Sequence, residues 1–106
     1  MNPVLSILTP TLPSRQKQYT NLMSQLLPQV HAVDAAVEVL SLSDNYTMTI
    51  GEKRNKLISI STGDYVAFID DDDEIASTYI KDIIQGINTN PGVDTVNFRI
   101  VVNFLD

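Results

Sequence analysis

The sequence has no cysteine, and only four glycines occur among its 106 residues. The lack of cysteine excludes both a disulfide framework and a thiolate metal site. The glycines form neither G-x-G-x-x-G nor G-x-x-x-x-G-K-[ST], so the standard dinucleotide-binding and P-loop signatures are absent. No apolar run approaches the roughly 18 residues of a membrane span, and the N-terminus lacks the basic and apolar regions of a signal peptide. The sequence therefore predicts a cytoplasmic protein without a membrane span.

Basic residues are also scarce, since seven lysines and arginines stand against thirteen aspartates and glutamates and give a formal net charge of −6. A protein that binds nucleic acid or an anionic membrane non-specifically needs a basic face, so this charge argues against both kinds of partner. Hydrophobic residues make up 43% of the chain, which is close to the globular norm and enough for a core. Length and composition together predict one acidic globular domain over residues 1–106.

Four apolar segments alternate with three segments of helical periodicity. The strands predicted from the apolar segments are 3–11, 35–44, 64–70 and 93–105. Such alternation with short connections predicts a Rossmann-like α/β fold, in which a mostly parallel sheet is covered by helices on both faces. Sheets of this kind bind ligands at the carboxyl ends of their strands. Three of these ends are polar here, at 9–14, 43–45 and 70–73.

The three helices are predicted from their apolar spacing and their end signals. The first has Ser14 as a candidate N-cap and is expected to stop at Pro28. The second is expected over 51–63, with Gly63 as its closing residue. The third begins near Ser77 and carries isoleucines at helical spacing.

The last predicted strand, 93–105, has apolar side chains on both faces. This is the pattern of an interior strand, which other elements normally cover. Left uncovered, such a surface promotes association between copies of a chain. We therefore expect self-association through this strand.

Four consecutive aspartates follow the third predicted strand in "YVAFIDDDDEI" (65–75). Their like charges repel one another, and none is buried cheaply without a partner. Carboxylates at i and i+2 in a tight loop can converge on one hard cation such as Mg²⁺ or Mn²⁺, which would relieve the repulsion. The alternative is a solvated acidic turn that caps the next helix at its positive end. The position at a strand end favours the metal site.

Two further features are candidates for ligand contacts. "GEKRN" (51–55) places Lys53 and Arg54 at a helix start, where ammonium, guanidinium and free N–H groups suit a phosphate. An ordinary solvated helix start has the same composition, and that alternative stays open. Asp44 ends the second strand, where its carboxylate can accept a hydrogen bond from a ribose hydroxyl or a base N–H, or cap a turn.

Four segments carry a resemblance to a known enzyme family. They are "SILTPTLPSR" (6–15), "VEVLSLSDN" (37–45), "KRN…STGDYVAFIDDDDEI" (53–75) and "STYI" (77–80). The third is similar to an R-N…A-x-G-(D/E)-Y-(hydrophobic)₃-D-x-D-D stretch and is the specific part. Together they resemble the opening strand, second strand, D-x-D region and following helix in the N-terminal half of a family 2 glycosyltransferase with the GT-A fold. The resemblance implies that the chain binds a nucleoside-diphosphate sugar, with a UDP-sugar as the expected ligand.

The resemblance also implies roles for single residues. Thr11 and Asp44 would line the nucleobase pocket, and Lys53 or Arg54 would face the base or the diphosphate. The segment "SLSDN" departs from the family, because many members have two adjacent acidic residues there.

By the same resemblance, Asp70 and Asp72 would form the D-x-D element that holds Mn²⁺ or Mg²⁺, with Asp72 as the closer contact. Asp70 or Asp71 would lie near the ribose, so both are also candidates for substrate binding. The run of four leaves the register open, because Asp71 and Asp73 fit D-x-D as well.

Members of the family continue well past D-x-D, where the acceptor site and, in inverting enzymes, the carboxylate base are found. Here residues 74–106 follow the aspartates, and their carboxylates match no base motif. We therefore expect the donor-binding half of a glycosyltransferase, and the sequence leaves its status as an enzyme open. The alternative is a non-catalytic metal- or nucleotide-binding α/β domain, or a relic of an enzyme. A phosphotransfer domain with an aspartate nucleophile would have its acidic loop after the first strand, and a protein-interaction domain would bind no nucleotide.

Overall fold

The computed structural model describes residues 3–89 and 103–104. Its elements in chain order are β1 (Leu5–Thr11), the 3-10 turn η1 (Pro13–Arg15), α1 (Gln16–Ala32), β2 (Val37–Ser43), α2 (Ile50–Ile60), β3 (Tyr65–Phe68), β4 (Asp73–Glu74), α3 (Tyr79–Thr89) and β5 (Asn103–Phe104). No helix in the described part of the chain combines the length and the apolar character needed to cross a membrane.

The main sheet has three parallel strands in the order β2-β1-β3. β1 lies in the middle, pairs with β2 from Leu5↔Val37 to Thr11↔Ser43, and is buried at all seven positions. The apolar residues Leu5, Ile7 and Leu8 made β1 evident from the sequence. The hydroxyl-bearing residues of the strand are buried with them. The sheet confirms the predicted α/β class.

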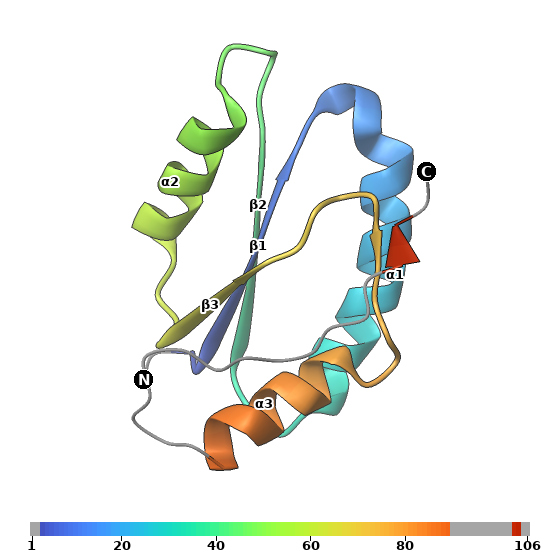
Figure 1. Cartoon of the computed structure of the whole chain (residues 1–106), viewed down its shortest axis with the longest axis vertical. Coiled ribbons are helices and arrows are strands. Elements are labelled where there is room, and N and C mark those ends of the chain that lie inside the picture. The colour runs from blue at the N-terminus through green and yellow to red at the C-terminus, as the bar shows by residue number, and fades with distance from the viewer. Residues whose placement is uncertain (1–2, 90–102, 105–106) are drawn as a thin grey trace.

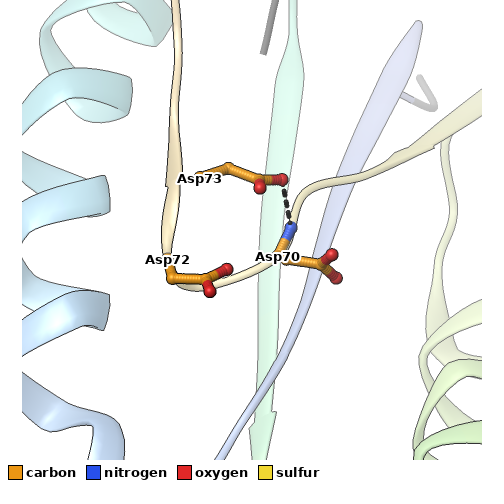
Figure 2. Close-up of side chains that lie close together, drawn as sticks. All are labelled: Asp70, Asp72 and Asp73. Atoms are coloured by element: carbon orange, nitrogen blue, oxygen red, sulfur yellow. Dashed lines mark hydrogen bonds between the residues drawn. The ribbon is translucent and has the colours of Figure 1, made fainter. Parts of the chain in front are cut away.

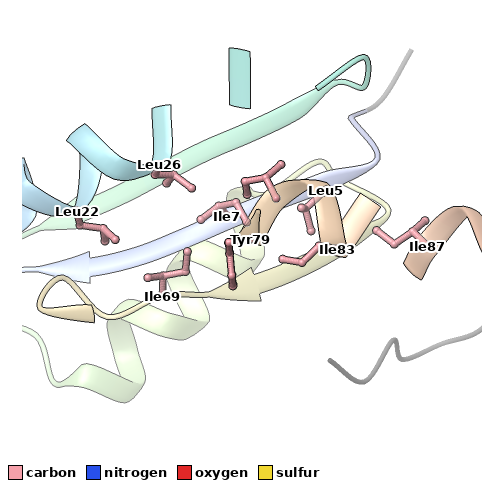
Figure 3. Packing of buried hydrophobic residues seen from close by; sticks show 9 residues of the cluster. Leu5, Ile7, Leu22, Leu26, Ile69, Tyr79, Ile83 and Ile87 are labelled. Atoms are coloured by element: carbon pink, nitrogen blue, oxygen red, sulfur yellow. The ribbon is translucent and has the colours of Figure 1, made fainter. Parts of the chain in front are cut away.

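Helices cover both faces of this sheet, as the sequence predicts (Figure 1). α2 lies on one face, and α1 and α3 lie on the other. Leu5 and Ile7 of β1 pack with α1 and α3 in one apolar cluster, because alternate residues of a strand point to the same face (Figure 3). The buried members of the cluster are Leu5, Ile7, Leu22, Leu26, Ile69, Tyr79, Ile80, Ile83 and Ile87.

A second, two-stranded sheet was not predicted. β4 pairs antiparallel with β5, in the register Asp73↔Phe104 and Glu74↔Asn103. The strand expected over 93–105 is therefore described only at 103–104, and its remaining residues lie outside the described part of the chain. The self-association expected from that strand remains a prediction.

The prediction that the first helix stops at Pro28 was wrong, because α1 continues to Ala32. A proline inside a helix removes one N–H donor and normally ends the helix. Here the next residue secures the last turn, since the Gln29 side chain donates to the Ala76 carbonyl at 2.8 Å and accepts from the Ile80 N–H at 3.0 Å. Tertiary hydrogen bonds thus override the local signal.

Two other helix ends also differ from the sequence expectation. Ser14 is not an N-cap, since it lies within η1 and α1 begins at Gln16 without a side-chain cap. The second helix ends at Ile60, three residues before the glycine expected to close it. Its start is set by a capping box that the sequence reading missed, in which Thr49 and Glu52 each accept the other's backbone N–H.

Gly63 does not end a helix but lets the chain approach β1 closely. A Cβ atom at this position would lie 2.7 Å from the Ser6 backbone nitrogen and 2.8 Å from the Leu5 carbonyl carbon. The Gly63 N–H donates to the Ser6 hydroxyl at 2.9 Å, so the two segments are also joined by a hydrogen bond. At position 63, between α2 and β3, only glycine fits without a shift of the backbone.

We expect Gly63→Ala to lower the free energy of unfolding by about 1–3 kcal/mol, the range for overpacking a buried contact. Gly51 in α2 is the matched control, because a Cβ there would meet only the Thr49 hydroxyl at 4.0 Å. Gly51→Ala should instead stabilise the protein by about 0.4–1 kcal/mol through the entropy of the unfolded chain. Urea unfolding measures both variants, and equal effects would contradict the close approach.

Candidate functional site

Polar residues from separate segments meet at the carboxyl ends of the parallel strands. Thr11 ends β1, Asp44 directly follows β2, and Asp70 comes two residues after β3. Because the three neighbouring strands run parallel, these ends gather at one edge of the sheet. α2 adds Lys53 and Arg54 to the same edge. We call this region the carboxyl edge.

Lys53 connects the ends of β1 and β2. Its side chain is only 4% exposed, its Nζ lies 2.6 Å from Asp44 Oδ1, and it donates to the Thr11 carbonyl at 2.7 Å. Lys53 shares the buried face of α2 with Leu57, one helical turn further on. The ammonium is therefore committed to two protein partners.

Asp44 is held by the loop that follows it as well as by Lys53. Its Oδ2 accepts from the backbone N–H groups of Thr47 and Met48, both at 2.7 Å. The loop contains Tyr46, whose φ of 62° lies in the left-handed region that non-glycine residues seldom adopt. The hydrogen bond from Lys53, followed by those from the loop, lowers the pKa of Asp44 from 3.8 to about 2. Both carboxylate oxygens are engaged.

Asp71 is fully occupied by protein donors. Arg15 Nε donates to its two oxygens at 2.7 and 2.8 Å, and the Thr11 hydroxyl donates to Oδ2 at 2.8 Å. The Asp71 side chain is only 6% exposed, whereas that of Asp72 is 44% exposed. The hydrogen bonds that Arg15 donates to Asp71 also raise the pKa of the Arg15 guanidinium above its usual value.

The other three aspartates form a separate group, which we call the acid cluster. Each of Asp70, Asp72 and Asp73 offers a carboxylate oxygen, and these oxygens lie within 4.8 Å of one another. Figure 2 shows the three side chains around one turn of the chain, with Asp73 reaching back to accept the backbone N–H of Asp70 at 2.9 Å. The structure therefore brings Asp70 and Asp72 together as the D-x-D reading requires, adds Asp73, and leaves Asp71 out.

Asp73 has the most unusual surroundings in the cluster. The residue is 8% exposed, and its Oδ1 is buried without a hydrogen-bond partner. Burial is the main cause that raises the pKa of this carboxyl, and the charges of its three neighbouring aspartates add to the effect. Tyr79 lies close by, and its own burial together with the charge of Asp73 raises the pKa of the phenol to about 12. A buried carboxylate oxygen without a donor is unfavourable unless the carboxyl takes up a proton or a cation approaches it.

Arg54 differs from Lys53 in that it is open to solvent. Its Nη2 lies 3.6 Å from Asp70 Oδ1, and its guanidinium carbon is 5.6 Å from the centre of the Phe68 ring. Nearly half of its side chain is exposed. Of the two basic residues predicted at this helix start, only Arg54 is free to contact a ligand at the carboxyl edge.

A groove lies elsewhere, between α1 and α3. Its volume is about 1320 Å³, and among the described residues that line it none belongs to the acid cluster. Gln25 and Gln29 on its wall use their side chains to hold the backbone of Ile75, Ala76 and Ile80. The groove lies between helices rather than at strand ends, and the charged residues among its described lining are Asp34 and Lys81.

Sequence reasoning missed two residues of the site. Arg15 was not singled out, although it directly follows the polar segment that ends the first strand. Asp73 was considered only as an alternative register of D-x-D. The burial of Lys53 could have been foreseen, because it lies four residues before Leu57 on an apolar helical face.

The lowered pKa of Asp44 makes part of the stability depend on pH. A carboxylate whose pKa is lower in the folded state contributes stability above the unfolded value of 3.8, and this contribution is lost as the pH falls through about 2. We expect Asp44→Asn to be less stable than the wild type in urea unfolding at pH 7, with a difference that shrinks between about pH 4 and pH 2. Lys53→Met should reduce the same pH dependence, while the loop hydrogen bonds to Asp44 keep part of it. A difference that stays constant across this range would contradict the ion pair.

One comparison with known proteins finds a family match for this chain. The family model described as glycosyl transferase family 2 matches residues 25–104, which include β2, α2, β3, the acid cluster and α3. Searches of curated proteins and of solved structures find no match. Because the family match covers most of the chain and includes the strand-end aspartates, the chain belongs to glycosyltransferase family 2.

Proposed function

We propose that the carboxyl edge binds a nucleoside-diphosphate sugar, with UDP-sugar as the ligand, and that a divalent cation bound by the acid cluster supports this binding. The family membership supports nucleotide-sugar binding in general. The single observation that carries the proposal is the meeting of three carboxylates at the end of β3, within 4.8 Å of one another.

The acid cluster fits Mn²⁺ or Mg²⁺ on two grounds. Its donor atoms are all carboxylate oxygens, the ligands that hard divalent cations prefer. The buried Asp73 Oδ1 has no donor from the protein, so one ligand position is already desolvated. Asp70 and Asp72 would hold the cation together with Asp73, and when bound it would neutralise the diphosphate as the bond to the anomeric carbon breaks.

The remaining residues of the edge would orient the nucleotide. Thr11 and Asp44 lie at the ends of adjacent strands, and Lys53 fixes their separation by contacting both. Lys53 acts through the protein in this proposal and does not contact the diphosphate. Arg54, exposed beside Asp70, is the side chain that would meet the diphosphate, because its guanidinium can donate two hydrogen bonds to phosphate oxygens.

A second candidate function is a nucleotide-binding domain that transfers no sugar. It would use the same edge and the same cation, so binding measurements alone do not separate it from the donor-binding half of an enzyme. Sugar transfer to an added acceptor separates the two, since only the enzyme would form a glycosidic bond.

We expect the chain to bind uridine diphosphate more tightly with Mn²⁺ than with a chelator by about tenfold or more, or about 1.4 kcal/mol. Isothermal titration calorimetry measures both affinities. Asp72→Asn should remove most of the gain, because it deletes one cation-facing carboxylate. Asp34→Asn, an exposed aspartate outside the carboxyl edge, should keep it. Equal affinity with and without Mn²⁺ would contradict the proposed cation site. No binding in either condition would contradict nucleotide-sugar binding at the carboxyl edge.

Replacing Arg54 with alanine tests its place at the diphosphate. The variant should lose roughly 1.5–3 kcal/mol of binding to uridine diphosphate, the range for a hydrogen bond to a charged group. The loss should shrink with uridine, which has no phosphate. Lys56→Ala, an exposed change two residues further along α2, should have little effect on either ligand. Similar losses for both ligands in Arg54→Ala would place the guanidinium at the base instead.

A further inference from the structure

Arg15 contacts two of the four aspartates in unequal ways. Its Nε binds Asp71 at 2.7 and 2.8 Å, whereas its Nη2 lies 3.2 Å from Asp72 Oδ2. The side chain of Asp71 is buried and that of Asp72 is 44% exposed. The contact with Asp72 is therefore the longer one and the one more screened by water.

The short contact between Arg15 and Asp71 keeps Asp71 out of the acid cluster. Two donors, Arg15 Nε and the Thr11 hydroxyl, are directed at the Asp71 oxygens, and Oδ2 receives both. A guanidinium stays charged at every working pH, so this pairing is permanent. The carboxylates left for another cation are those of Asp70, Asp72 and Asp73.

The longer contact between Arg15 and Asp72 keeps a positive charge next to Asp72. A divalent cation that approaches Asp72 meets this guanidinium and must share the carboxylate with it or displace Nη2. The 3.2 Å contact can break while the Nε bonds to Asp71 remain, because they involve a different nitrogen of the same group. Arg15 thus lowers the charge that the cluster presents without occupying the cluster itself.

We propose that Arg15 is a positioning residue of the acid cluster, which withdraws Asp71 from it and competes with a divalent cation for Asp72. Arg15 has this role only if the acid cluster binds a cation, as proposed above. The competition sets the affinity for the cation low in the absence of nucleotide. A purely structural arginine would have the opposite signature, since its loss would loosen the loop and weaken cation binding.

Binding of Mn²⁺ to the full chain without nucleotide tests the competition, with the electron paramagnetic resonance signal of free Mn²⁺ as the readout. Arg15→Met should bind Mn²⁺ about fivefold more tightly, the effect of one unit charge a few ångströms away in a medium close to water. Arg15→Lys keeps the charge and should stay within about twofold of the wild type. The double variant Arg15→Met with Asp71→Asn restores the net charge and should still bind Mn²⁺ more tightly than the wild type, because no guanidinium competes for Asp72 in it.

Lys81→Met is the control for net charge, because Lys81 is exposed on α3 and lies on the wall of the α1–α3 groove. It should change the affinity for Mn²⁺ by less than about twofold. Circular dichroism establishes that each variant is folded. If Arg15→Met does not fold, Arg15→Gln decides by the same criterion, since its amide can still donate to Asp71.

Unchanged or weaker Mn²⁺ binding in the folded, neutral Arg15 variant overturns the competition and leaves the proposed cation site standing. A double variant that returns to the wild-type affinity also overturns it, because net charge and not competition for Asp72 would then be the cause. A wild-type chain that binds no Mn²⁺ overturns the cation site itself, and the role of Arg15 with it.

Discussion

A buried lysine ammonium holds the carboxyl edge of this protein together. Lys53 lies between the Asp44 carboxylate and the Thr11 carbonyl, with 2.6 and 2.7 Å contacts to groups on two different strands. An ammonium that loses such partners while buried is strongly unfavourable, so the ends of β1 and β2 are constrained to stay together. The Thr11 hydroxyl extends the constraint to the loop after β3, because it donates to Asp71 at 2.8 Å. One connected set of polar contacts therefore sets the positions of all three strand ends.

The four aspartates then separate by what surrounds them rather than by their order in the chain. Asp71 is neutralised within the protein, and Asp73 is buried with one oxygen unpartnered. Asp70 and Asp72 are half exposed, and each contacts a different arginine. Like charges this close are tolerated only where each has a partner or can gain one. Among the described residues, none donates a hydrogen bond to Asp73 Oδ1. This missing donor is the physical reason to expect a cation at the cluster.

Much of the fold was readable from the sequence, because β1 carries closely spaced apolar residues and the helices keep an apolar face. The edge that carries the site also followed, since polar residues end three parallel strands. The partners of the charged residues did not follow. Arg15 and Asp71 are 56 residues apart, and Lys53 and Thr11 are 42 apart. No periodic pattern encodes which basic side chain reaches which strand end, so Lys53 was expected at a phosphate although it turns inward.

The account rests on the claim that ligands bind at the carboxyl edge and not in the groove between α1 and α3. Two-dimensional ¹⁵N NMR of the full chain, titrated with uridine diphosphate and Mg²⁺, tests this claim most directly. The account predicts that the largest chemical-shift changes fall on the backbone amides of Thr11, Asp44 and Arg54 and of the acid cluster. Changes confined to the groove, around Gln25, Gln29 and Lys81, would contradict it.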